Sequence, residues 1–268
     1  MRIRIRHATT YAYDHPAIGV IQALRVTPVE HEGQRVLNWR VDVDVDGVLR
    51  TSRDAFGNQL NLFYAEGPVS ELTIRVSGEA EVRDTAGVVR GAPEPLPPAT
   101  FRRPTPLTTA DAGLAAWAAG IDGPDPLSRL HRLMAALHER LEFDSGLCAD
   151  TPAAEAFDTA RGGCQAYAHV FIAATRSLGL PARFVSGHLC RQEAGPEEAA
   201  YAWAEAYVPD LGWTGFDAAA GACPDQRYLR VAVGLDYLDA APLRGARRSG
   251  GDERLSVEVA GRASQRQD

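Results

Sequence analysis

The sequence predicts an α+β fold, in which an antiparallel β domain precedes a core of helices and further antiparallel strands. Apolar and polar residues alternate through much of residues 1–88, whereas apolar residues recur every three or four positions after the Pro-rich segment at 91–98. A chain of 268 residues is long enough for two domains with separate cores. We expect four parts: a sandwich-like β domain (1–90), a stiff linker (91–108), a core (109–245), and a C-terminal strand with a frayed tail (246–268).

The N-terminal domain is predicted from short runs that are apolar at alternate positions. They occupy residues 2–6, 37–45, 60–64 and 72–82, with turn signals at Asp46-Gly47 and Gly57-Asn58. Alternation with period two is typical of strands that are buried on one face. Several such strands separated by turns favour a sandwich-like antiparallel domain. No cluster of chemically reactive side chains stands out in it.

The core is predicted to begin with helices. Residues 109–120 have helical periodicity, and Asp125-Pro126 combines an N-cap candidate with a residue that suits the first helical position. His131 and His138 lie off the apolar face of this second helix, and we expect them to be exposed to solvent rather than to bind a metal. The apolar positions that share the face are Leu127, Leu130, Met134, Leu137 and Leu141.

Glycines mark both ends of the most informative predicted helix. A short helix that starts at Thr151-Pro152 ends near Arg161, and Gly162-Gly163 then breaks the chain. The next helix runs from Cys164 to a stop at Gly179. Strands are expected after it, at residues 182–189, 201–208, 213–216, 229–233 and 255–259.

Composition excludes several functions. The formal net charge is −7 and all 28 basic residues are Arg, which excludes mechanisms based on a Schiff-base, P-loop or kinase-type lysine. The acidic balance argues against a nucleic-acid partner. No run of about 18 apolar residues could span a membrane. Residues 1–6 lack the apolar region of a signal peptide, so we expect a cytoplasmic protein.

The cysteines are expected to be free thiols, because disulfides are rare in the cytoplasm. No Cys-x-x-Cys spacing indicates zinc and no Asp/Asn-rich loop indicates calcium, so we expect no metal and no organic cofactor. Cys164 differs from Cys148, Cys190 and Cys223, because it lies where Gly-Gly meets a predicted helix N-terminus. Unpaired N–H groups and the helix dipole favour a thiolate there. The alternative is a buried cysteine that acts as a small apolar residue.

Five segments carry a resemblance to a known family. They read RGGCQAYAH (161–169), RSLGLPARFVSG (176–187), YAWAE (201–205), GWTGFD (212–217) and RVAVG (230–234). In this order and at this spacing they resemble the core of the bacterial transglutaminase-like family, and residues 1–90 are similar to the β domain at the N-terminus of those proteins. The resemblance implies a papain-like fold, in which a helix that carries Cys packs on an antiparallel sheet that carries His and Asp.

The resemblance also implies a reaction. In the family, the Cys attacks a carboxamide to form a thioester, which water or an amine resolves. Cys164 matches the nucleophile and Asp217 matches the acidic residue, but Tyr201 stands at the position of the His. A phenol with a reference pKa of about 10 is neutral at pH 7, so it cannot form an ion pair with a thiolate. Loss of general acid–base help typically lowers the rate by about 10²–10⁴-fold.

Three alternatives are open at this position. His188 could replace the base, because its strand is expected to pair beside the strand of Tyr201. Tyr201 could itself act in catalysis, with Asp217 orienting it. The site could also be inactive. His169 is a poorer candidate for the base, because five residues after Cys164 turn it about 140° away around the helix.

The other candidate residues each have a structural alternative. Gln165 could present its amide to an oxyanion in the substrate-binding site. Trp203 could contact substrate, although a core position is the commoner role for such a residue. Glu205 is expected to be solvated or paired with Arg. Cys148 lies on a loop that is expected to approach Cys164, so the two thiols could form a redox pair.

We therefore expect a cysteine-dependent amide-bond enzyme, either an amidase or peptidase or an acyl transferase. It would act on a peptide or small amide through a Cys164 thioester. The alternative is a catalytically inactive relative that binds a peptide or partner in the former cleft. Ala166, where relatives often carry Asp, and the sequence DAAAG at 217–221, in place of DPTNG, fit an altered or an inactive site. The sequence leaves open whether the protein forms a homo-oligomer.

Overall fold

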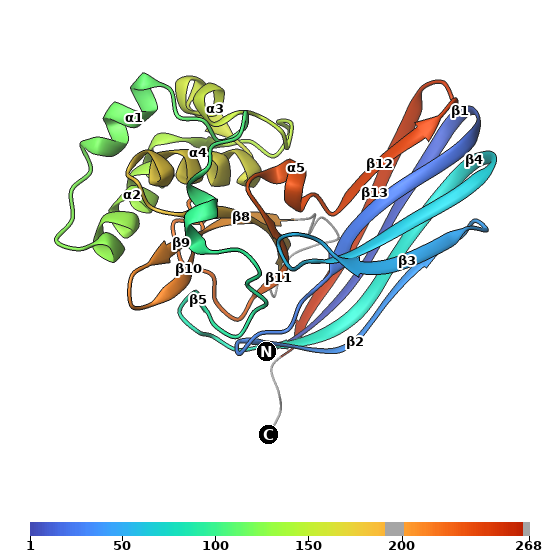
Figure 1. Ribbon diagram of the computed structural model, residues 1–268, viewed down its shortest axis with the longest axis horizontal. Coiled ribbons are helices and arrows are strands. Elements are labelled where there is room, and N and C mark those ends of the chain that lie inside the picture. Colours follow the sequence, from blue (N-terminus) through green and yellow to red (C-terminus); the bar gives the residue numbers. More distant parts are fainter. Residues whose placement is uncertain (191–200, 265–268) are drawn as a thin grey trace.

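The computed structural model describes residues 1–190 and 201–264, and it confirms the α+β class. Two antiparallel sheets lie side by side, and the helices pack on only one of them (Figure 1). In the described residues, no helix is long and apolar enough to cross a membrane. The strands of the larger sheet are β1 (Arg2–Thr27), β2 (Gln34–Val43), β3 (Val48–Arg53), β4 (Gln59–Val82), β12 (Leu243–Arg248) and β13 (Glu253–Ser264).

Two very long strands organise the larger sheet. β1 and β4 contain 26 and 24 residues and pair with each other along their length. The pairing is irregular between Ala12 and Ala17, where Pro16 provides no N–H for the ladder. Before this irregularity β1 also pairs with β13, and after it β1 pairs with β12. Three of the short runs predicted from the sequence, 2–6, 60–64 and 72–82, are therefore pieces of these two strands, while the run at 37–45 corresponds to β2.

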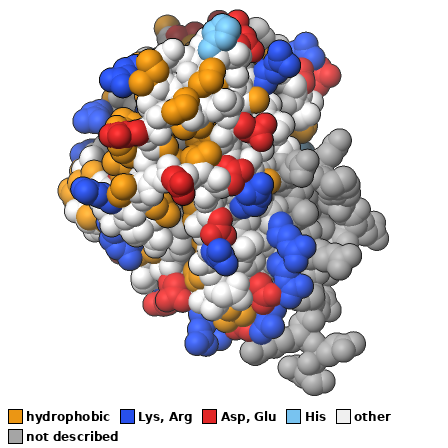
Figure 2. Space-filling view, turned by 90° about the vertical axis from the view of Figure 1, so that its right-hand side faces the viewer, with side chains coloured by type: hydrophobic (Ala, Val, Ile, Leu, Met, Phe, Trp, Pro, Cys, Tyr) orange, Lys and Arg blue, Asp and Glu red, His pale blue; other side chains and the backbone are white. Residues whose placement is uncertain are grey.

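Both halves of the long strands contribute to one apolar core. This core contains residues from both sides of the irregularity. A single bent sheet therefore forms the core that was expected between the two sheets of a sandwich. Its members are Tyr11, Tyr13, Ala17, Val20, Leu24, Val26, Phe63, Ala65, Val69, Leu72, Ile74 and Val76. On the outer face, Tyr64 pairs with Ile21 on one side and with Val48 on the other, and the three side chains are 42%, 45% and 52% exposed. Figure 2 faces this end of the molecule and shows hydrophobic side chains among charged ones.

The domain boundaries in the structure differ from those expected. β12 and β13 return to the N-terminal sheet, and β12 begins at Leu243, inside the segment predicted for the core. In the other direction, β5 (Val88–Val89) leaves the N-terminal region and pairs with a strand of the core sheet. Part of the expected frayed tail belongs to β13, which runs to Ser264. These pairings join residues more than 120 positions apart, and such contacts leave no local pattern in the sequence.

The core sheet supports the longest buried helix. Its order is β11 (Tyr228–Gly234), β8 (Ala182–Leu189), β9 (Tyr201–Val208), β10 (Gly212–Phe216) and β5. α4 (Cys164–Ser177) packs on β8 and β9, and the other helices surround it (Figure 1). The remaining elements are η1 (Pro98–Arg102), α1 (Ala112–Ala119), α2 (Pro126–Arg140), β6 (Glu142–Phe143), α3 (Ala153–Thr159), β7 (Arg161–Gly162) and α5 (Tyr237–Ala240).

A buried ion cluster ties three strands and the linker together. Arg183 of β8 donates from Nε to Glu205 of β9 at 2.6 Å, and Arg230 of β11 donates to the same carboxylate at 2.7 Å. Burial raises the pKa of Glu205, but Arg230 and Arg183 lower it to about 2. Arg183 also binds both carboxylate oxygens of Glu94, at 2.7 and 2.9 Å. The Pro-rich linker is therefore fixed to the core by a bidentate ion pair.

Two buried amides of the N-terminal region cap the outer edge of β11. Asn58 donates to the carbonyl of Val233 at 2.7 Å and accepts from its N–H at 2.8 Å. Gln34 does the same for Arg230, at 2.8 and 2.9 Å. Each amide thus takes the place of one residue of a missing neighbouring strand. The edge strand is satisfied without a further strand, and the two sheets are joined.

Replacing Asn58 should destabilise the protein strongly. In Asn58→Ala, the N–H and C=O of Val233 lose their partners in a buried place, which costs about 1–3 kcal/mol for each group. Urea unfolding followed by circular dichroism measures the loss. Asn38→Ala, at an exposed position on β2, is the control. Equal midpoints for the two variants would contradict this role of Asn58.

Candidate active site

Cys164 is the first residue of α4, and two glycines allow its position. A Cβ on Gly162 would lie 2.6 Å from the Cβ of Ala166, and one on Gly163 would lie 3.3 Å from the carbonyl oxygen of Asp144. The segment before the helix therefore packs against the first turn of α4 more closely than a side chain would permit. The sequence predicted both the break at Gly-Gly and the helix that follows it.

The thiol of Cys164 is buried and neutral. The residue is 7% exposed and belongs to the core cluster between α4 and the sheet. Its S–H donates to Oε1 of Gln165 at 3.3 Å. Burial raises the pKa of Cys164 to about 12, and a backbone hydrogen bond from Ala202 only partly opposes this, while Asp217 raises the pKa further. Desolvation thus outweighs the helix N-terminus, which by itself favours a thiolate.

Asp217 accepts hydrogen bonds from two tyrosines. Its Oδ2 accepts from the hydroxyl of Tyr201 at 2.9 Å and from that of Tyr228 at 2.8 Å. Its Oδ1 accepts from the N–H groups of Ala219 and Ala220, at 3.0 and 3.1 Å. Burial raises the pKa of Asp217, while these four hydrogen bonds lower it.

Tyr201 interacts with both the acid and the nucleophile. Burial raises its pKa, and the negative charges of Asp217 and of a Cys164 thiolate raise it further. The phenol is therefore neutral, and its proton points to Asp217. The structure thus brings together three of the predicted residues: Cys164, Tyr201 and Asp217.

Tyr228 is a site residue that the sequence reasoning missed. It begins β11, its hydroxyl donates to Asp217, and its ring lies edge-on to Tyr201, with centroids 6.1 Å apart. Burial and Asp217 raise its pKa. A tyrosine at the start of a predicted strand carries no functional signal of its own. Only the register that brings β11 next to β8 shows that Tyr228 and Tyr201 lie at the same end of the sheet.

His188 lies against the N-terminal sheet. Phe184, Ser186 and His188 share one face of β8, but they contact three different elements. The ring of Phe184 packs on His169 of α4, Ser186 donates to Ala240 of α5, and the ring of His188 is 6.5 Å from that of His7 on β1. Within residues 1–190 and 201–264, His188 thus contacts the N-terminal sheet and has no contact with Cys164.

Burial keeps His188 neutral. Desolvation and then His7 lower its pKa to about 3, and its Nδ1 has no hydrogen-bond partner among the described residues. A small cavity beside it is also lined by His7 and Arg25. In this surrounding His188 belongs to the junction between the two sheets.

His169 holds two segments around α4. It is fully buried, its Nδ1 lies 3.0 Å from the carbonyl oxygen of Thr151, and its Nε2 accepts from the N–H of Tyr237 at 3.2 Å. Because Nε2 accepts, the proton is on Nδ1. Burial lowers the pKa of His169 to about 4, so the ring is neutral and serves as a structural link.

The remaining predicted residues have clear positions. Trp203 is 3% exposed and packs edge-on against Tyr228, with centroids 5.4 Å apart, in a core cluster that does not include Cys164. Cys148 is exposed, and both it and Cys164 are free thiols. Among the described residues, no group of three or more His, Cys, Asp or Glu side chains could hold a metal.

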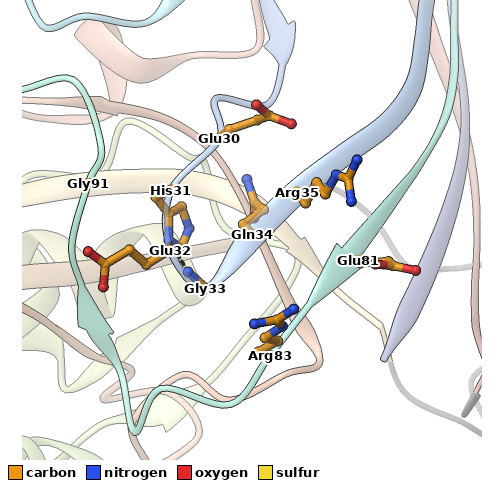
Figure 3. Close-up of a pocket in the computed structure, with 9 residues that line it drawn as sticks. All are labelled: Glu30, His31, Glu32, Gly33, Gln34, Arg35, Glu81, Arg83 and Gly91. Carbon is orange, nitrogen blue, oxygen red and sulfur yellow. Dashed lines mark hydrogen bonds between the residues drawn. The ribbon is translucent and has the colours of Figure 1, made fainter.

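A polar cavity of about 430 Å³ lies where the N-terminal sheet meets the linker. Figure 3 shows charged side chains of both signs around it, and His31, which accepts from the N–H of Gly33. It contains no cysteine, serine or threonine that could act as a nucleophile. The residues around it are Glu30, His31, Glu32, Gly33, Gln34, Arg35, Glu81, Arg83 and Gly91.

A buried helix that starts at a cysteine, on an antiparallel sheet with an acidic side chain at the same end, defines the papain-like class of folds. Comparison with known families then assigns the chain more closely. Residues 3–81 match the bacterial transglutaminase-like N-terminal region, and residues 115–218 match the transglutaminase-like superfamily. The chain belongs to the transglutaminase-like superfamily, as its motifs indicated.

Similar proteins match nearly the whole chain. An uncharacterised protein of Mycobacterium leprae is 27% identical over 278 residues, which cover 96% of this chain and 97% of the relative. An uncharacterised protein of Mycobacterium tuberculosis is 28% identical over 272 residues. The aligned residues cover 91% of this chain and 87% of that protein. A crystal structure of a candidate cysteine protease from Cytophaga hutchinsonii has a TM-score of 0.78 at 20% identity. It covers 99% of this chain and 92% of that chain, and it supports the fold alone.

Acid should destabilise the protein below pH 6.5. Burial lowers the pKa of His31 and His169 to about 4 and that of His188 to about 3. In the unfolded chain these groups take up protons near the ordinary pKa of about 6.5, but in the folded protein they do not. Their stabilising effect is complete above pH 6.5 and is lost as the pH falls toward 4, by up to about 1.4 kcal/mol per pH unit for each histidine.

Urea midpoints at pH 7.5 and pH 5 measure this effect. His188→Asn removes one of the three groups and should reduce the difference between the two midpoints. His15→Asn, at an exposed position, is the control and should leave the difference unchanged. A His188→Asn variant with the wild-type pH dependence would show that this histidine does not contribute.

Proposed function

We propose that this protein is a cysteine-dependent enzyme that acts on an amide bond through a thioester at Cys164, with Tyr201 in the position of the usual histidine. The observation that carries the proposal is the 2.9 Å hydrogen bond from Tyr201 to Asp217, next to a cysteine at a helix N-terminus. A phenol oxygen can accept one proton while its own proton is given away. The Tyr–Asp pair can thus move a proton without forming a charged tyrosine.

In the first step, Sγ of Cys164 attacks the amide carbon and the C=O electron pair moves to the oxygen. The thiol proton passes to the oxygen of Tyr201, and the proton of Tyr201 passes to Oδ2 of Asp217. Burial raises the pKa of Asp217, which favours this transfer. The backbone N–H groups at the start of α4 and the amide of Gln165 are the groups available to the developing oxyanion.

In the second step, one proton moves back and the other leaves with the amine. Asp217 returns a proton to Tyr201, and Tyr201 gives its other proton to the nitrogen of the leaving amine. The C–N bond breaks as the C=O bond re-forms, which leaves a thioester on Cys164. Water then hydrolyses the thioester, or an amine accepts the acyl group. The fold and the nucleophile are common to both outcomes.

A second candidate function is binding without catalysis. The observation that favours it is the state of the thiol: Cys164 is 7% exposed, burial raises its pKa to about 12, and no histidine among the described residues contacts it. The former cleft would then hold a peptide or a partner protein. The same Tyr–Asp pair would serve as a polar wall of that cleft.

Tyr201→Phe should separate these functions. The variant keeps the ring and removes only the proton-carrying hydroxyl, so turnover of peptide p-nitroanilides should fall by about 10²–10⁴-fold. Release of p-nitroaniline measures turnover, and intact mass spectrometry after incubation with p-nitrophenyl acetate detects the acyl-enzyme. Cys164→Ala is the background control. Wild-type turnover equal to that of Cys164→Ala for every amide would favour the binding protein.

Tyr201→His should activate the thiol. An imidazole that Asp217 orients can form an ion pair with a thiolate, which lowers the pKa of a cysteine by several units in such pairs. Alkylation of Cys164 by iodoacetamide at pH 7.5 should become at least about tenfold faster. Peptide mapping measures the rate, and the exposed Cys148 in the same molecule is the reference. An unchanged rate would show that position 201 does not act on the thiol.

A further inference from the structure

We propose that Phe143 and Leu147 form an apolar rim that binds a large apolar side chain of the substrate. The preferred substrate is then a peptide with an aromatic or aliphatic residue next to the amide that is attacked. This inference rests on the proposed function and names the substrate class of the same site.

The exposure of these two side chains is unusual within the core domain. Phe143 is 52% exposed and Leu147 is 40% exposed. In the described part of the core, only Leu238 is another large apolar side chain with comparable exposure. Single exposed apolar residues are ordinary on protein surfaces. Here two of them lie within five residues, on β6 and in the turn that follows it.

Phe143 lies directly beside the segment that leads into α4. Phe143 is the strand partner of Gly162, which precedes Cys164 by two residues. Its ring lies 6.3 Å from that of Tyr167, and Tyr167 is one helical turn after Cys164. A peptide bound with its carbonyl carbon at the thiol would therefore lie within reach of Phe143.

The segment is held in place at both ends. Asp144 donates its N–H to Gly162 at 2.9 Å, and its carboxylate accepts from Arg161 at 2.9 Å and from the N–H of Gly146 at 2.9 Å. At the other end, the carbonyl of Thr151 contacts the buried His169. Little ordering is therefore needed when a ligand covers Leu147, and a preorganised surface binds more tightly than a loose one.

Phe143 and Leu147 lie outside the core cluster around α4, which contains Tyr167. A substrate side chain on Phe143 and Leu147 would remove apolar surface from water on both partners. The amide to be attacked would then lie toward Gly163 and Cys164.

Two reagents with the same reactive group test the proposal. We would compare phenylalanyl and glycyl chloromethyl ketones by the second-order rate constant for labelling Cys164, followed by peptide mapping. The wild type should prefer the phenylalanyl reagent about tenfold or more. Phe143→Ser and Leu147→Ser should reduce the preference to about twofold or less, and Phe143→Leu should retain most of it. Val48→Ser, on the outer face of the N-terminal sheet, is the matched control and should keep the wild-type preference.

Equal rates for the two reagents in the wild type, or no labelling by the phenylalanyl reagent, would overturn the proposal. A preference that survives Phe143→Ser and Leu147→Ser would also overturn it. Because labelling reports access to the thiol, its result is independent of turnover. A preference without amide turnover would support the rim and contradict the proposed catalysis. Amide turnover without a preference would support the proposed catalysis and contradict the rim.

Discussion

The ion cluster around Glu205 fixes the register of the core sheet, on which the site depends. Arg183 and Glu205 are direct partners across β8 and β9, and Arg230 reaches the same carboxylate from β11. A fully buried carboxylate that loses its partners is strongly destabilising, so other pairings of these strands are disfavoured. A shift of one residue would also turn the small residues of β9 away from α4. The positions of Tyr201 and Tyr228 follow from this register.

Burial and the choice of tyrosine fit each other at the site. An imidazolium and a thiolate are two charges, and both would lose water in the closed space between α4 and the sheet. Two phenols and a thiol are neutral, so Asp217 provides the single charge of the group and receives four hydrogen bonds for it. Ala166 and the small residues after Asp217 leave no second acid there. These residues therefore act together and make a site with little charge.

Much of the fold could be predicted from the sequence, because local patterns determine it. The helix from Cys164, the strands after it and the acidic Asp217 follow from periodicity, glycines and family motifs. The continuity of β1 and β4 could not be predicted, since a polar and Pro-containing bend divides their alternation. The neighbours of His188 depend on how one sheet docks on another. The protonation of Cys164 depends on burial, which a helix N-terminus does not reveal, and Tyr228 enters the site only through strand register.

The return of β12 and β13 to β1 makes the N-terminal domain discontinuous along the chain. The core is inserted between the strands of one sheet. During synthesis on the ribosome, β1 emerges early but meets these two strands only after more than 200 further residues. One edge of β1 is therefore unpaired during this time. The pairing is slow, because it closes a loop that contains all the residues between β1 and β12. All strands of the core sheet have therefore been synthesised before the N-terminal sheet can be completed.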